Sequence, residues 1–226
     1  KNKKKLWKYL IMKELNKRIL SSILIIPVVL FFIINGSISF LLFISLIFLL
    51  TCYEWIKMSK NNELIRIFGI FFLLFSFTTA YLIRENYNLN FIIIIIIVCV
   101  FTDIGGYIFG KFFKGPKLTK ISPKKTYAGV IGGFLISLIA GFVYLEYSSN
   151  KEFLNIDHFW IILLILFISL ISQIGDLIIS YFKRKAKLKD TGRIIPGHGG
   201  ILDRIDGLIF VFPIIYVLNL IIHLTL

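Results

Sequence analysis

The sequence predicts an all-α, polytopic integral membrane protein with about seven transmembrane helices and a cytoplasmic N-terminus. Three observations lead to this fold class. First, 58% of the 226 residues are hydrophobic, whereas soluble domains average about 45–50% apolar residues. Second, the apolar segments approach the roughly 20 residues that a helix needs to cross a bilayer. Third, the positive charges fall almost entirely on one side of the resulting topology.

Seven apolar segments are the candidate spans, and they cover residues 19–35, 37–55, 67–83, 91–110, 128–147, 159–181 and 205–224. Only a turn-like Asn-Gly-Ser separates the first segment from the second, so an interfacial hairpin remains an alternative for the second. We expect a single transmembrane domain over residues 1–226, with the polar motifs gathered within residues 100–210.

The distribution of Lys and Arg supports this topology. With the N-terminus inside, the four inner segments 1–18, 57–66, 111–125 and 183–204 hold 24 of the 26 basic residues. Cytoplasmic loops are enriched in Lys and Arg in this way. The net charge of +14 therefore does not indicate nucleic acid as a partner. A basic inner loop can also be only a topology signal, or bind anionic lipid headgroups.

Carboxylates lie at the inner ends of three predicted spans. Asp103 lies toward the inner end of the fourth, Asp176 near that of the sixth, and Asp203 and Asp206 open the seventh. The Ser-Pro-Lys-Lys-Thr segment, residues 122–126, precedes the fifth span on the same side. Ionisable groups inside a membrane are costly and mark functional sites. The convergence predicts a site for a cytosolic reactant and a lipid headgroup, and the outer halves of the spans offer little to an ion pathway.

The spacing of these residues indicates the chemistry. Asp203 and Asp206 share a helical face at i, i+3. Asp176 and Ser180, with Lys183 or Arg184, form a second stripe. Clustered carboxylates repel one another unless a cation joins them, and hard oxygen ligands favour Mg²⁺ over zinc. The neighbouring Lys and Arg would repel a bare metal, so phosphate is expected to complete the charge balance. This combination is typical of phosphoryl or nucleotidyl transfer.

Other polar and glycine motifs have simpler interpretations. The GxxxG pairs at 106–110 and 129–133 indicate helix packing. The sequence at 105–111 resembles the start of a P-loop, but Phe112 replaces the expected hydroxyl residue and the segment lies within a span, so we reject a P-loop there. Glu54, at the inner end of the second span, is interpreted as a carboxylate that reaches the membrane interface, and a place in the site is the alternative.

The segment SYFKRKAKLKDTGRIIPGHGGILDRID, Ser180–Asp206, resembles the signature of the phosphatidate cytidylyltransferases, or CDP-diacylglycerol synthases. Upstream, Asp103–Lys111, Ser122–Gly129 and Ser172–Ser180 resemble other family motifs in the expected order, so the resemblance covers roughly residues 100–210. The matching signature positions are Ser180, Lys183, Arg184, Lys189, Asp190, Gly192, Ile195, Pro196, His198, Gly199, Gly200, Asp203, Arg204 and Asp206.

The resemblance implies a homodimeric membrane enzyme that uses Mg²⁺ to form CDP-diacylglycerol and pyrophosphate from CTP and phosphatidic acid. It implies a bacterial inner-membrane location with the site facing the cytoplasm. The candidate catalytic residues are Asp176, Lys183, Arg184, Lys189, Asp190, His198, Asp203, Arg204 and Asp206, of which Asp176, Asp203 and Asp206 would hold the metal. The candidate substrate-binding residues are Asp103, Tyr107, Ser122, Lys124, Lys125, Thr126, Ser180, Gly199 and Gly200.

Three alternatives remain beside this interpretation. Asp103 is expected to line the nucleotide or metal cavity with Tyr107, but a hydrogen-bonded aspartate that packs between helices would look the same in sequence. A CTP-dependent lipid kinase would transfer the γ-phosphoryl group instead of the cytidylyl group. A divalent-cation transporter is a third class, and the scarcity of carboxylates in the outer halves of the spans argues against it.

Overall fold

The structure is a computed structural model that describes residues 23–119, 122, 125–148, 157–195 and 199–225. The described residues form helices joined by short loops, with no strand among them and two isolated β-bridges, Lys117–Thr126 and Ile195–Gly199. A helix over Ile23–Asn35 comes first. The others are α2 (Ser37–Met58), α3 (Glu63–Asn86), α4 (Leu89–Phe113), α5 (Tyr127–Tyr147), α6 (His158–Lys185), α7 (Leu202–Ile205) and α8 (Leu208–Thr225).

Within the described part of the chain, the five helices α2 to α6 are long and apolar enough to cross a membrane. Two shorter apolar helices, Ile23–Asn35 and α8, lie where the first and last spans were predicted. The protein is thus an all-helical integral membrane protein, and the count of seven spans and the cytoplasmic N-terminus stay predictions. The helix α2 is one continuous helix of 22 residues, which disfavours the interfacial hairpin.

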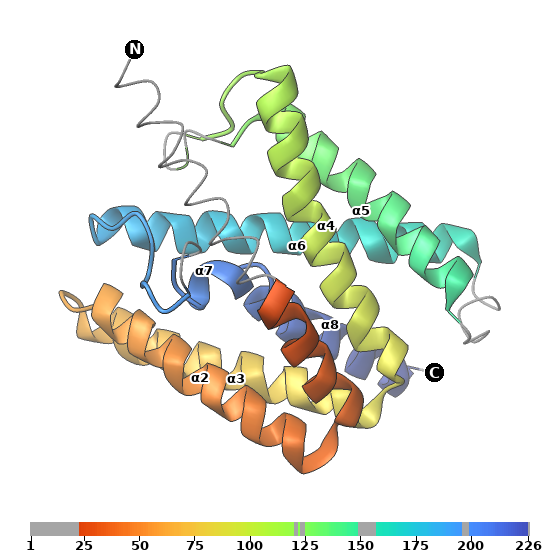
Figure 1. Ribbon diagram of the computed structural model, residues 1–226, viewed down its shortest axis with the longest axis horizontal. Coiled ribbons are helices and arrows are strands. Elements are labelled where there is room, and N and C mark those ends of the chain that lie inside the picture. Colours follow the sequence, from red (N-terminus) through yellow and green to blue (C-terminus); the bar gives the residue numbers. More distant parts are fainter. Residues whose placement is uncertain (1–22, 120–121, 123–124, 149–156, 196–198, 226) are drawn as a thin grey trace.

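Two helix pairs are joined through α6 and α8 (Figure 1). In one pair α4 packs along α5, and in the other α2 packs along α3. The helix α6 contacts α4, α5 and α8, and α8 in turn packs against α3. The short α7 lies beside α6 and near the end of α2 (Figure 1), so the signature segment is placed between the two pairs.

Glycines allow α4 and α5 to approach closely. A Cβ on Gly129 would lie 2.8 Å from the backbone carbonyl of Gly106, and one on Gly105 would collide with the carbonyl of Gly132. A helix pair that buries small residues in this way gains van der Waals contact between backbones. The prediction that the glycine motifs serve helix packing is confirmed.

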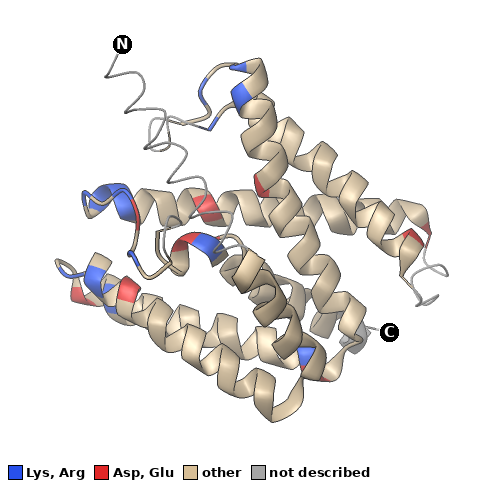
Figure 2. Ribbon diagram, viewed as in Figure 1, with Lys and Arg blue, Asp and Glu red and all other residues tan. Residues whose placement is uncertain are grey.

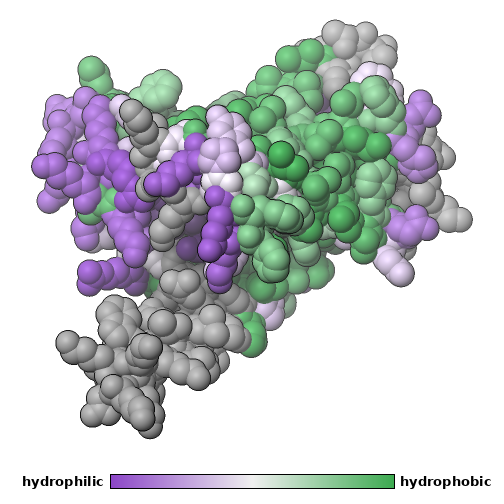
Figure 3. Space-filling view, turned by 90° about the horizontal axis from the view of Figure 1, so that it is seen from above, coloured by the Kyte–Doolittle hydropathy of each residue, from purple (hydrophilic) through white to green (hydrophobic). Residues whose placement is uncertain are grey.

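The charged residues divide the molecule into two ends. Lys and Arg gather at the α2–α3 turn, the α4–α5 loop and the C-terminal end of α6 (Figure 2). A broad hydrophobic zone separates this hydrophilic end from a smaller hydrophilic region at the opposite end (Figure 3). Arg84, near the C-terminal end of α3, is the one basic residue that the structure describes at the opposite end, where it donates to the carbonyls of Ile33 and Ile34. The asymmetry read from the sequence is thus present in the fold.

Candidate active site

A cavity of about 290 Å³ lies between α4, α5 and α6, near the basic end of the molecule. The α4–α5 loop contributes to its wall, as predicted for the Ser-Pro-Lys-Lys-Thr segment. Asp103 is one of the residues that line this cavity, and its expected role in binding a nucleotide or metal stays a prediction. The lining residues are Thr102, Asp103, Gly106, Tyr107, Ser122, Lys125, Thr126, Gly129, Val130, Gln173 and Asp176.

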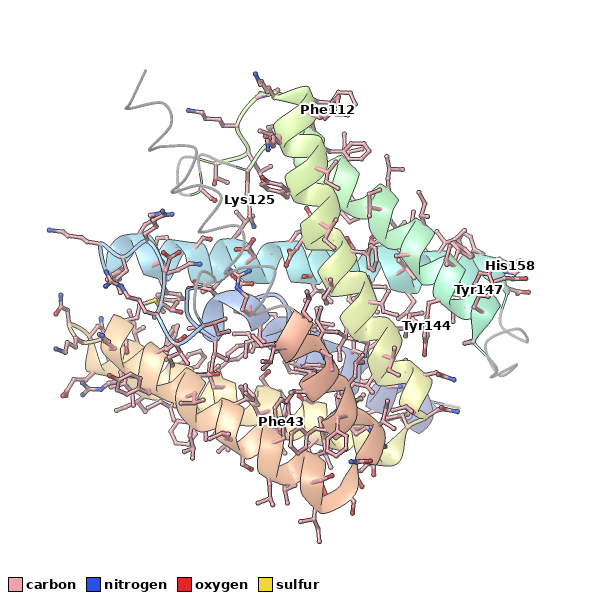
Figure 4. The ribbon with its side chains drawn as sticks, viewed as in Figure 1. Phe43, Phe112, Lys125, Tyr144, Tyr147 and His158 are labelled. Atoms are coloured by element: carbon pink, nitrogen blue, oxygen red, sulfur yellow. The ribbon has the colours of Figure 1, made fainter. Side chains whose placement is uncertain are left out.

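A carboxylate and an ammonium group form an ion pair at the wall of the cavity. Lys125 Nζ lies 2.5 Å from Asp176 Oδ2, and Figure 4 shows Lys125 between the α4–α5 loop and α6. The other oxygen of Asp176 accepts a hydrogen bond of 3.2 Å from Ser180, one turn further along α6. Thr126 begins α5 by accepting a hydrogen bond of 3.1 Å from the N–H of Gly129, and this cap fixes the loop that carries Lys125.

Asp206 links the signature segment to Asp176 in the wall of this cavity. Its carboxyl group is buried and lies close enough to those of Asp176 and Asp103 for their negative charges to repel one another. Arg204 lies within electrostatic range of Asp103. Among the described residues no group of three or more His, Cys, Asp or Glu side chains is arranged to hold a metal ion.

The carboxylate pair nevertheless fits Mg²⁺. This ion is usually held by one or two carboxylates together with substrate phosphates, rather than by a complete cage of protein ligands. Asp176 and Asp206, beside a cavity that also holds the ammonium group of Lys125, would provide the protein part of such a site. The neighbouring negative charges would repel each other without a cation or a shared proton.

The signature segment is organised around Asp203. Its Oδ1 accepts a hydrogen bond of 2.8 Å from the buried Lys183, whose Nζ also lies 3.9 Å from Asp206 Oδ2. Its Oδ2 accepts hydrogen bonds from the N–H groups of Thr191, at 2.8 Å, and Gly200, at 3.0 Å. Burial acts to raise the pKa of Asp203, but the Lys183 ammonium and the two backbone N–H groups outweigh it and hold the pKa below its usual range. Asp203 is therefore ionised at neutral pH.

The interpretation of Glu54 as an interfacial carboxylate is wrong. The side chain is 1% exposed and lies under the signature segment, so it does not reach out of the protein. Its Oε1 accepts a hydrogen bond of 3.0 Å from Ile201 N–H, and its Oε2 accepts bonds of 2.9 Å and 2.8 Å from Leu202 N–H and the Thr191 hydroxyl. No local pattern in the sequence indicates this contact, because its partners lie 137 to 148 residues away along the chain.

The remaining predicted residues lie around these two groups. Arg184, Lys189 and Asp190 are exposed, and the Arg184 guanidinium donates to the carbonyl of Leu188. Gly199, at φ +87°, adopts a backbone conformation that favours glycine and sits against Asp190 and Asp203. Lys124 and His198 lie outside the described residues, so their predicted roles stay predictions.

Residues 61–222 match the model of the cytidylyltransferase family. This range contains the cavity and the whole signature segment, while α2 with Glu54 precedes it. The chain belongs to the cytidylyltransferase family, and is thus a nucleotidyltransferase that is built into a membrane.

Several bacterial relatives carry the name phosphatidate cytidylyltransferase. The protein of that name from Rickettsia bellii is 35% identical over 208 residues, which cover 89% of each chain. The one from Rickettsia felis is 34% identical over 209 residues, covering 90% of this chain and 91% of the relative. The one from Bacillus subtilis is 40% identical over 135 residues, but these are 59% of this chain and 49% of the relative.

Proposed function

We propose that this protein is a phosphatidate cytidylyltransferase, which forms CDP-diacylglycerol and pyrophosphate from CTP and phosphatidic acid in phospholipid biosynthesis. The observation that carries the proposal is the approach of the signature segment to the cavity: Lys183 of α6 contacts Asp203 and Asp206, and Asp206 interacts electrostatically with Asp176 of the cavity wall. The cavity between the helices is thus joined to the signature segment, in a chain whose relatives bear this name.

In the proposed site, Asp176 and Asp206 are the direct protein ligands of Mg²⁺. Asp203 remains a third candidate, through the oxygen that now pairs with Lys183. Bound Mg²⁺ supplies positive charge that stabilises the transition state of nucleotidyl transfer. Lys125 and Lys183 neutralise phosphate charge, since each ammonium lies within 4 Å of one of these carboxylates and can contact phosphates bound to the same ion.

The reaction itself requires no nucleophile from the protein. A phosphate oxygen of phosphatidic acid attacks the α-phosphorus of CTP in line, the bond to the β-phosphate oxygen breaks, and pyrophosphate leaves. The cavity wall aligns the two reactants, with Asp103 and Tyr107 of α4 facing Ser122 and Lys125 of the loop. Alignment of this kind converts an encounter of two substrates into a reaction within one complex.

Labelled CTP separates this function from its rivals. Purified protein in detergent, with phosphatidic acid and MgCl₂, is expected to transfer the α-label of CTP into a lipid-soluble product and to release the γ-label as pyrophosphate. A γ-label in the lipid fraction, with CDP as the soluble product, would instead identify a lipid kinase. Divalent-cation flux in liposomes without nucleotide turnover would identify a transporter.

The proposed setting is the bacterial inner membrane, with the site facing the cytoplasm where CTP is present. The basic end of the molecule, which holds the α4–α5 loop and the end of α6, supports this orientation. Accessibility of a single cysteine introduced at the exposed Lys187 to a membrane-impermeant reagent tests it: labelling is expected in inverted vesicles and not in intact cells. The homodimer is tested by native mass spectrometry of the detergent complex.

A further inference from the structure

Glu54 occupies an unusual position for an ionisable side chain. It lies near the inner end of α2, yet it is 1% exposed. The neighbouring Trp55 fixes this end of the helix, because its indole donates to the Arg66 carbonyl and its ring packs edge-on against Phe182 of α6. Glu54 therefore points into the protein between α2 and the signature segment, not toward lipid.

Three donors surround the Glu54 carboxylate. Two are the N–H groups of Ile201 and Leu202 at the start of α7, and the third is the Thr191 hydroxyl. The N–H groups at the start of a helix have no partner within the helix. A buried carboxylate can satisfy them, and the helix in turn favours a negative charge there. Glu54 is thus the cap of α7, supplied by a helix far away in sequence.

The backbone of the signature segment packs closely around the Glu54 carboxylate. A Cβ on Gly192 would collide with Glu54 Oε1, and a Cβ on Gly200 would collide with both the Glu54 carboxylate and the Thr191 hydroxyl. The two glycines let the segment close around the carboxylate from both sides. This fit explains why the signature segment has glycine at these positions without any appeal to phosphate.

Thr191 connects Glu54 to the candidate active site. Its buried hydroxyl lies 2.8 Å from Glu54 Oε2 and 3.1 Å from Asp203 Oδ2. A hydroxyl has one proton, so it donates to one carboxylate at a time, and the shorter distance favours Glu54. The N–H of the same residue donates to Asp203 Oδ2, whose other oxygen holds Lys183. Hydrogen bonds therefore run without a break from Glu54 to Lys183.

We propose that Glu54 is a positioning residue: it anchors Thr191 and the start of α7, and thereby fixes Asp203, Lys183 and Asp206 for nucleotidyl transfer. The positioning role rests on the proposed function, whereas the anchoring of the segment does not. Glu54 is absent from the cavity lining, and it lies outside the range matched by the family model. It acts through Thr191 and α7, as residues behind metal ligands and catalytic groups commonly do.

The test compares Glu54→Gln with Thr51→Val, a control one turn earlier on α2. Thr51 is equally buried, but its hydroxyl bonds only within its own helix, to the Ile47 carbonyl, among the contacts described. Glu54→Gln keeps the size of the side chain and replaces one acceptor oxygen by a donor. We expect the Mg²⁺ concentration for half-maximal activity to rise about tenfold or more, while the KM for phosphatidic acid changes little. A smaller folded fraction alone would leave the Mg²⁺ dependence unchanged.

Amide hydrogen exchange gives a readout without substrate or metal. In Glu54→Gln we expect faster exchange in peptides that cover residues 189–206, and unchanged exchange in α4 and α5. Thr51→Val should leave both regions as in the wild type. Uniformly faster exchange, or wild-type exchange with wild-type Mg²⁺ dependence, would overturn the proposal.

Thr191 provides a second variant in case Glu54→Gln does not fold. Thr191→Val removes only the hydroxyl and should reproduce the higher Mg²⁺ requirement and the local exchange, while Thr191→Ser should restore both. The effects of Glu54→Gln and Thr191→Val should be less than additive, because both remove the same contact. Wild-type behaviour of Thr191→Val would refute the link. Absence of a cytidine lipid from the wild-type protein would refute the proposed function, and the exchange experiment would still test the anchor.

Discussion

The two aspartates nearest the centre of the site are held in opposite ways. Asp176 lines the cavity, its side chain is 25% exposed, and its described partners are Lys125, Ser180 and the carboxyl of Asp206. The Asp203 side chain is 6% exposed, and both of its oxygens accept hydrogen bonds from Lys183 and the signature backbone. Asp176 thus faces the cavity, whereas Asp203 faces the protein.

This difference shows why residue type and spacing do not by themselves assign a role. A carboxylate that lies beside another carboxylate at a cavity contributes repulsion to the folded state, and a metal ion that joins the two would relieve it. A carboxylate with three or more donors stabilises the backbone that surrounds it. Replacement of the first should change activity more than stability, and replacement of the second should change both.

The largest effect is expected at Asp176. Asp176→Asn removes a charge that faces the cavity, and we expect the turnover of CTP to fall about 10³-fold, in the range found for loss of a main electrostatic group. The midpoint of thermal unfolding should stay the same or rise, because repulsion from Asp206 is relieved. Initial rates and unfolding in the same detergent measure both quantities. Substantial activity at ordinary Mg²⁺ concentrations would remove Asp176 from the proposed metal site.

Asp203→Asn should have a mixed effect. From the sequence alone, this variant is expected to lose nearly all turnover and to fold normally. The structure changes the second expectation, because the new amide would face Lys183 or a backbone N–H, and a poorly satisfied buried donor costs about 1–3 kcal/mol. We now expect a loss of turnover of about 10²-fold or more together with a lower unfolding midpoint. Asp190→Asn, at an exposed carboxylate of the same segment, is the control for stability.

Lys125 should affect substrate affinity more than stability. Its ion pair with Asp176 is partly exposed, with both side chains 25% accessible, so the pair itself adds little stability. We expect Lys125→Ala to raise the KM of CTP or phosphatidic acid about tenfold, equal to about 1.4 kcal/mol of binding. Lys125→Arg should not restore it, because a planar guanidinium does not replace a compact ammonium group. Unchanged KM values for both substrates would reduce Lys125 to a topology signal.

Sequence reasoning found the cavity side of the site because its signals are local. Asp103 and Asp176 stand out as carboxylates within apolar segments, and the predicted helix directions place both near the same membrane surface. Once the direction of a spanning helix is known, the position of a residue along that helix predicts its depth in the membrane. The structure brings both residues to one cavity with Lys125 and Thr126, as that argument expects.

The part of the site around Glu54 and Asp203 could not be predicted in this way. Glu54 lies at a boundary between an apolar helix and a basic loop, where a carboxylate is ordinary in any membrane protein. Its burial depends on the packing of α2 against α3 and on the path of a loop that lies more than a hundred residues later. The difference between Asp176 and Asp203 likewise depends on tertiary contacts, since Thr191 and Gly200 approach Asp203 only when the signature segment folds back on itself.

The last effect is expected on stability rather than on activity, at a place where neither kind of carboxylate is involved. The cavity wall depends on α4 and α5, which touch through backbone, whereas the signature segment depends on hydrogen bonds to side chains. A Cβ on Gly105 would collide with the Gly132 carbonyl and lie 2.8 Å from the Ile136 Cβ. Because neither atom can move without its helix, we expect Gly105→Ala to lower stability by about 1–3 kcal/mol.

Gly141→Ala is the matched control for this variant. Gly141 is also buried in a helix interface, but an added Cβ would lie 2.6 Å from Ile165 Cδ1, the tip of a side chain that can rotate away. Thermal unfolding in detergent should therefore rank Gly105→Ala well below Gly141→Ala, with the latter close to the wild type. Equal midpoints would mean that α4 and α5 separate at little cost. In that case the cavity wall that α4 and α5 form opposite Asp176 would not be rigid. The contrast between a fixed cavity and an anchored signature segment would then no longer hold.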